Sequence, residues 1–153
     1  SPILVYACQR ASNQCVKLLD RIASGEIYGV ITTETLSELT NTLMILEARD
    51  SGFINNNSSI SEISKLNGKI RILNRYENLI KDLLSVGLKL ESVTREDFLT
   101  AMKYQRQYGL LINDALFLAA ADRLRITTIV SNKENFKNIP GVIFYSPDDL
   151  INM

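Results

Sequence analysis

The sequence contains no histidine, and this absence excludes several kinds of active site. Serine–histidine–aspartate catalysis, histidine-ligated zinc and the most common general base at neutral pH all require that side chain. Only two cysteines are present, Cys8 and Cys15, too few for a structural zinc site or a framework of disulfide bonds. Acid–base or metal chemistry is therefore expected from carboxylates, lysine, tyrosine or cysteine.

The chain also lacks a long hydrophobic run. Its longest uninterrupted apolar stretches, residues 3–8 and 115–121, are far shorter than the roughly 20 residues that span a bilayer. No basic segment precedes an apolar one near the first residue, so no signal peptide is visible. We therefore expect a cytoplasmic protein without a membrane-spanning segment.

Neither sign of charge is in excess, because 17 basic side chains balance 17 acidic ones among 153 residues. A neutral total does not favour nucleic-acid binding by the whole surface, so any such site is expected to be a local basic patch. Four basic residues of one predicted helix are candidates for binding RNA phosphates: Lys65, Lys69, Arg71 and Arg75. The alternative is a solvated helix surface on which nearby glutamates balance these charges.

The pattern of apolar residues predicts strands that alternate with helices. Strands are expected as short apolar runs at residues 28–32, 88–93, 127–130 and 142–145. Helices are expected at residues 13–23, 33–48, 60–86, 94–108 and 113–124, with a short helical turn at 133–137. Apolar strands joined by helices predict an α/β fold, in which a parallel sheet is flanked by helices on both faces. The length suits a single domain over residues 1–153.

Five segments resemble conserved parts of the PIN domain family, in the right order. Residues 1–7, SPILVYA, are similar to its first helix, and Ser1 before Pro2 fits a helix start, although the composition also suits a strand. Residues 18–39 resemble the second helix, the second strand and the start of the third helix. Residues 111–124, LINDALFLAAADRL, resemble the segment in which an aspartate opens an alanine-rich helix. Residues 129–136, IVSNKENF, and 142–147, VIFYSP, resemble the last two strands and the turn between them.

This resemblance implies a three-layer PIN fold and a metal-dependent ribonuclease that cleaves single-stranded RNA. In such a site carboxylates at one end of the sheet hold Mg²⁺ or Mn²⁺. Glu38 matches the glutamate of the third helix and Asp114 matches the aspartate of the alanine-rich helix, so both are candidate catalytic and metal-binding residues. Their alternative roles are structural, as a capping-box residue with Thr35 for Glu38 and a favourable charge at a helix N-terminus for Asp114.

The sequence departs from the family pattern at two places. The family's first aspartate lies two residues before the position matched by Ser1, at the end of a central strand, which we therefore expect upstream of residue 1. The aspartate of the motif Thr-x-Asp-x-x-Phe is replaced by Lys133, and Asn135 stands where a second acid often follows. Ser131 keeps the hydroxyl group of the motif, and Glu134 could replace the lost acid if the turn shifts by one residue.

The ammonium group of Lys133 has two interpretations. It could be an internal counter-ion for Glu38 and Asp114 at the place of a metal ion, or an ordinary exposed residue of the turn. Three functions therefore remain open. They are an active ribonuclease, resembling toxins of the virulence-associated protein C type with an antitoxin partner, a catalytically degraded PIN domain that binds RNA or protein, and a generic doubly wound binding domain.

A homodimer is expected as well. The family often forms dimers, and the predicted helix over residues 60–86 is longer than one core can cover. Its apolar stripe would then pair with a second copy of the chain.

Overall fold

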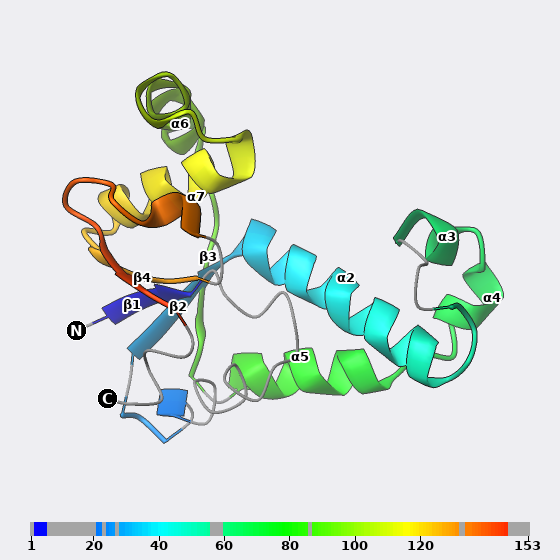
Figure 1. The fold of residues 1–153 in the computed structure, drawn as a ribbon. Coiled ribbons are helices and arrows are strands. Elements are labelled where there is room, and N and C mark those ends of the chain that lie inside the picture. The colour runs from blue at the N-terminus through cyan, green and yellow to red at the C-terminus, as the bar shows by residue number, and fades with distance from the viewer. Residues whose placement is uncertain are drawn as a thin grey trace.

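The structure is a computed structural model of the chain. It describes residues 2–5, 21–22, 24–26, 28–55, 60–85, 87–131 and 134–146. Its strands form one parallel five-stranded sheet in the order β3-β2-β1-β4-β5 (Figure 1). Their bounds are Pro2–Val5 for β1, Tyr28–Thr32 for β2, Lys89–Glu91 for β3, Thr128–Val130 for β4 and Ile143–Tyr145 for β5. The predicted parallel sheet is therefore confirmed, including the four strands expected beyond residue 20.

The central strand corrects the interpretation of the first residues. Residues 2–5 form β1, in which Leu4 pairs with Val30 on one side and with Ile129 on the other, so the predicted helix is wrong there. The central strand was expected upstream of residue 1, and in the structure β1 occupies that place. The physical reason is composition, because an Ile-Leu-Val run suits a buried strand and proline is tolerated as its first residue. The aspartate expected upstream of Ser1 stays a prediction.

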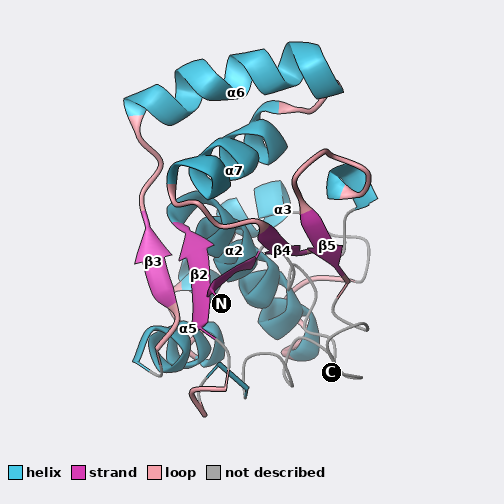
Figure 2. Ribbon diagram, turned by 90° about the vertical axis from the view of Figure 1, so that its left-hand side faces the viewer, coloured by secondary structure: helices cyan, strands magenta, loops and turns pink. Residues whose placement is uncertain are grey.

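Helices cover both faces of the sheet, as predicted. Consecutive residues of a strand point to opposite faces. Val30 and Ile129 accordingly belong to the apolar cluster that includes helix α7 (Ile112–Arg123), whereas Ile31 and Val130 belong to the cluster that includes helix α2 (Thr33–Asp50). Figure 2 shows α7 lying between the sheet and helix α6 (Arg95–Tyr108). On the opposite side, α5 (Arg75–Ser85) packs along α2 (Figure 1).

Both predicted ends of the helix α6 are confirmed by their capping contacts. Thr94 and Asp97 form a reciprocal capping box at the start of α6, with each side chain accepting a hydrogen bond from the backbone N–H of the other residue. The same helix ends at Gly109, whose φ of 69° is the left-handed conformation that glycine adopts without strain. Among the residues of the expected helix 13–23, the structure describes only Arg21 and Ile22 as helical, and residues 11–20 and 23 lie outside the described residues.

The long helix predicted over residues 60–86 is wrong, because the chain divides there into three short helices. These are α3 (Ile60–Ser64), α4 (Asn67–Ile70) and α5. Leu66 leaves the helical conformation with φ −111° and ψ 54°. The carboxylate of Glu47, at the far end of α2, accepts hydrogen bonds from the backbone N–H groups of Asn74 (2.9 Å) and Tyr76 (2.8 Å). These bonds satisfy N–H groups at the start of α5 and fix it as a separate helix.

We call residues 52–55 together with residues 60–70, which include α3 and α4, the distal lobe. It lies at the end of α2 that is remote from the sheet (Figure 1). A small apolar cluster built on Ala48 and Leu73 holds it to α2. No helix within the described ranges is long and apolar enough to cross a membrane.

Candidate active site

Glu38 lies in the second turn of α2, which starts directly after the carboxyl end of β2. Its side chain is half-buried, and its Oε1 accepts a hydrogen bond of 3.0 Å from the side-chain amide Nδ2 of Asn113. Asn113 belongs to the first turn of α7, on the opposite face of the sheet. This bond therefore joins helices from both outer layers at the carboxyl end of the strands, where ligand sites of parallel sheets lie.

Asp114 follows Asn113 in the same helical turn and is 3% exposed. Its Oδ2 accepts a hydrogen bond of 2.8 Å from the side-chain amide Nδ2 of Asn135. Asn135 belongs to the short 3₁₀ helix η1 (Glu134–Phe136), which comes after β4 and confirms the predicted helical turn. The positive end of the α7 dipole also favours a negative charge at this position. Asp114 is thus a buried carboxylate held by a neutral partner and placed one residue from the contact that Glu38 makes.

At the carboxyl ends of β2 and β4 lie residues with buried hydroxyl groups, and not carboxylates. Thr32 is 1% exposed, and its Oγ1 donates a hydrogen bond of 3.0 Å to Oγ1 of Thr35 at the start of α2. Ser131 follows β4 and is fully buried, and its backbone N–H donates to the carbonyl oxygen of Tyr145 at 3.0 Å. The acids of this site accordingly come from helices that start near the strand ends.

The sequence comparison agrees with this geometry. A model of the PIN domain family matches residues 2–142. The chain belongs to the PIN domain family. No curated protein matches it.

Two solved structures share the fold of this PIN domain over almost their whole length. The first is a toxin–antitoxin complex from Klebsiella pneumoniae, with a TM-score of 0.53 and 17% identity over 94% of this chain and 96% of that one. The second is VapBC2 from Rickettsia felis bound to a DNA fragment from their promoter, with a TM-score of 0.52 and 18% identity over 95% of this chain and 98% of that one. The predicted PIN fold is confirmed, and at these identities the likeness shows the fold alone.

The other candidate residues do not all lie near the two acids of the PIN domain. Ser1 and Lys133 lie outside the described residues, as does the side chain of Glu134. The four predicted phosphate-binding residues lie in or next to the distal lobe or at the start of α5, toward the far end of α2 from Glu38 (Figure 1). From Glu38 to Asp50 this helix is about 18 Å long at 1.5 Å per residue. The structure therefore separates the basic candidates from the carboxylate pair.

Two amide side chains of the site were not predicted as partners of the acids. Asn113 was part of the matched segment, and Asn135 was interpreted only as a lost acid. The sequence gives only a weak indication of these roles, because each asparagine is simply a polar residue beside an expected catalytic position. Their contacts with Glu38 and Asp114 depend on tertiary packing, which spacing along the chain does not reveal.

The donor set decides which metal ion suits the PIN domain. Nowhere in the described part of the chain do three or more histidine, cysteine, aspartate or glutamate side chains form a cluster that could hold a metal ion. Glu38 and Asp114 offer hard oxygen ligands, and Mg²⁺ is usually bound by one or two carboxylates together with water and substrate phosphates. The oxygen ligands of these two side chains are of the type that Mg²⁺ and Mn²⁺ prefer, and they are too few for a closed cage of protein ligands.

Proposed function

We propose that this PIN domain is a metal-dependent endoribonuclease that cleaves phosphodiester bonds of single-stranded RNA. One observation carries the proposal: the hydrogen bond between Asn113 and Glu38, which ties the helix that carries Glu38 to the helical turn that carries Asp114 at the carboxyl end of the sheet. This placement is the one at which the family resemblance puts its metal-binding acids. It supports the proposal more strongly than a purely capping role, because a helix cap does not require contact between two different helices.

In this proposal the side chains of the chain have distinct tasks. Glu38 and Asp114 hold the divalent cation, while Asn113 and Asn135 fix the orientation of the two carboxylates. When bound, such a cation lowers the pKa of water and offsets negative charge on the scissile phosphate. Cleavage then breaks one P–O bond of the RNA backbone by attack of water.

A toxin with an antitoxin partner is the biological role that we propose for this activity. Support comes from the fold, which the chain shares with the two toxin–antitoxin structures.

We also propose a homodimer, although not through the surface first expected, because helix 60–86 is divided. Helix α6 instead exposes three large apolar side chains, Phe98, Leu99 and Met102, each about half accessible to solvent. Contiguous apolar side chains on a surface favour self-association.

A second function is favoured by the incomplete set of acids. Lys133 stands in the sequence where the family has an aspartate, and each of the two described acids already accepts a bond from an amide group. A site that does not bind a metal ion would make the chain an RNA-binding or protein-interaction module without catalysis.

The deciding experiment is calorimetric titration with Mn²⁺, followed by cleavage of a labelled single-stranded RNA. The wild type is compared with the double variant Glu38→Ala/Asp114→Ala. A matched control, Glu96→Ala/Asp82→Ala, removes one glutamate and one aspartate from exposed helix positions. We expect binding and cleavage in the wild type and the control, and neither in the site variant. A well-folded wild type that binds no Mn²⁺ would refute the nuclease proposal and favour the module.

The variant Lys133→Asp separates the two functions further. It restores the family's acid, so we expect tighter Mn²⁺ binding than in the wild type if the site is a metal site. An unchanged affinity would show that position 133 does not face the metal.

A further inference from the structure

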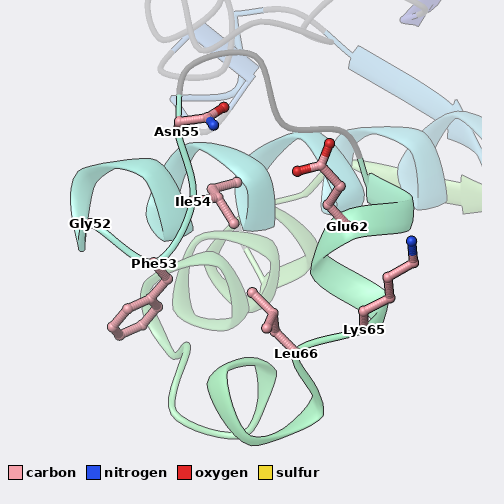
Figure 3. Close-up of a pocket in the computed structure, with 7 residues that line it drawn as sticks. All are labelled: Gly52, Phe53, Ile54, Asn55, Glu62, Lys65 and Leu66. Atoms are coloured by element: carbon pink, nitrogen blue, oxygen red, sulfur yellow. The ribbon is translucent and has the colours of Figure 1, made fainter.

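The distal lobe contains an open pocket that the proposed active site does not use. Its volume is about 550 Å³, and its wall is formed by seven residues: Gly52, Phe53, Ile54, Asn55, Glu62, Lys65 and Leu66. Figure 3 shows Ile54 and Leu66 in the middle of this wall, with Glu62 and Lys65 on the right, Phe53 on the left and Asn55 at the top. The pocket therefore combines an apolar floor with charged side chains at its border.

The segment that carries α3 and α4 is basic, although the whole chain is neutral. Residues 60–75 contain four basic side chains and one acidic side chain, Glu62. Lys65 and Lys69 are both exposed, and the ammonium group of Lys69 lies 4.7 Å from the centre of the Phe53 ring. Arg75 differs, because it forms an ion pair of 2.6 Å with Asp50. Two exposed cations, Lys65 and Lys69, and one carboxylate, Glu62, thus lie at the pocket.

The pocket is also set apart from the carboxylate pair. It adjoins the end of α2, about 18 Å along the helix from Glu38 by the rise of 1.5 Å per residue. A ligand that reached both places would have to be a chain of several units, and the two lysines at the pocket favour negative charge on it. Single-stranded nucleic acid has these properties, and it binds proteins through cationic grooves that also offer apolar contact to its bases.

We infer that the distal lobe is an anchoring site for single-stranded RNA. Lys65 and Lys69 contact backbone phosphates, and a base rests on the apolar floor formed by Ile54 and Leu66. The choice of RNA as the ligand rests on the proposed function. The anchor contacts phosphates and holds the strand without reading its sequence, whereas the carboxylate pair cleaves it.

Binding is measured by fluorescence anisotropy of a labelled single-stranded RNA oligomer in EDTA, between 50 and 200 mM salt. The variant Lys65→Gln/Lys69→Gln is compared with Lys103→Gln/Arg106→Gln, which removes the same charge from exposed positions of α6. We expect weaker binding in the lobe variant only. The slope of log K against log salt should also fall by about 0.7 for each lost phosphate contact. Equal losses in both variants would overturn the proposal, as would a wild type that does not bind RNA.

A second variant, which removes a negative charge, distinguishes the loss of a phosphate contact from misfolding of the lobe. Glu62→Gln removes the one carboxylate of the pocket wall, so RNA binding should tighten relative to the wild type and to the control Glu96→Gln. No gain at Glu62 would count against the anchor. Because EDTA removes divalent metal ions, this assay does not depend on catalysis. If the wild type does not cleave RNA but the lobe variants still alter RNA binding, the nuclease proposal alone is refuted. If the wild type cleaves RNA and the lobe variants bind it as the wild type does, the anchor alone is refuted.

Discussion

Asn113 and Glu38 are 75 positions apart in the sequence, yet the amide of the first donates a hydrogen bond of 3.0 Å to the carboxylate of the second. The bond ties the first turn of α7 to the second turn of α2, so it connects the two outer layers of the fold. Asp114 is the next residue along α7, so the bond to Glu38 lies one position from the second candidate acid.

Replacement of Asn113 by alanine should weaken Mn²⁺ binding. The carboxylate of Glu38 would lose the donor that orients it, and loss of such a supporting hydrogen bond typically costs 10- to 100-fold in metal affinity. Calorimetric titration measures the change, with the exposed Asn78→Ala on α5 as a matched control. An affinity equal to that of the control would mean that Glu38 does not need this partner.

Replacement of Asn135 by aspartate should make the stability of the chain depend strongly on metal. It places a second carboxylate at hydrogen-bond distance from Asp114, and the two negative charges repel each other until a cation lies between them. We expect a lower Tm than the wild type in EDTA and a larger rise in Tm on addition of Mn²⁺. Differential scanning calorimetry tests both. Identical rises in Tm for variant and wild type would contradict a metal site at Asp114.

The stability of the chain should fall in acid partly through Asp97. Burial raises the pKa of this carboxyl, but the hydrogen bonds from Arg123 and from Thr94 outweigh burial and leave its pKa below the ordinary 3.8. A lowered folded-state pKa stabilises the fold above the unfolded-state pKa, and this contribution is lost as the pH falls through the folded-state value. Asp97→Asn should therefore cost about 2 kcal/mol at neutral pH. The cost should shrink below roughly pH 4.

Urea unfolding at pH 7 and pH 3 measures this difference in the free energy of unfolding. The exposed Asp82→Asn on α5 is the control, for which we expect little cost at either pH. A cost for Asp97→Asn that is the same at both values would show that its charge is not what stabilises the start of α6.

Glu47→Gln should loosen the distal lobe before the rest of the chain. The carboxylate accepts bonds from the N–H groups of Asn74 and Tyr76, and a glutamine side chain has a single acceptor oxygen for the two. A buried donor left without an acceptor costs about 1–3 kcal/mol. Hydrogen exchange should become faster in α4 and α5 and stay unchanged in α6 and α7. Uniformly faster exchange would indicate that the lobe does not open separately.

Much of this architecture follows from local sequence patterns. The apolar runs at residues 28–32 and 127–130 have no alternating polar residues, and strands covered on both faces need none. The capping box of Thr94 and Asp97 and the glycine at position 109 fix both ends of α6 by local chemistry, so they could be predicted. The candidate acids Glu38 and Asp114 came from the resemblance, since an acid in a first or second helical turn is common in any protein.

Other features depend on contacts that lie far apart in the sequence. The apolar stripe over residues 60–86 predicted one helix, but Glu47 of a different helix fixes the start of α5 and so divides it. The first residues were ambiguous because Ile, Leu and Val suit a strand while Ser-Pro suits a helix start, and pairing with Val30 and Ile129 decides for the strand. The amide partners of the two acids have the same origin, as their contacts join separate helices.

Helix α2 carries Glu38 near one end and Glu47 near the other, and Glu47 fixes the start of α5 beside the distal lobe. An α-helix turns by about 100° and rises 1.5 Å with each residue. Insertion or deletion of a single residue between these two glutamates would therefore swing the lobe about the helix axis to a different side of the molecule. Substitutions in this segment can alter its surface, but its length fixes the direction from which anything held by the lobe approaches the two acids.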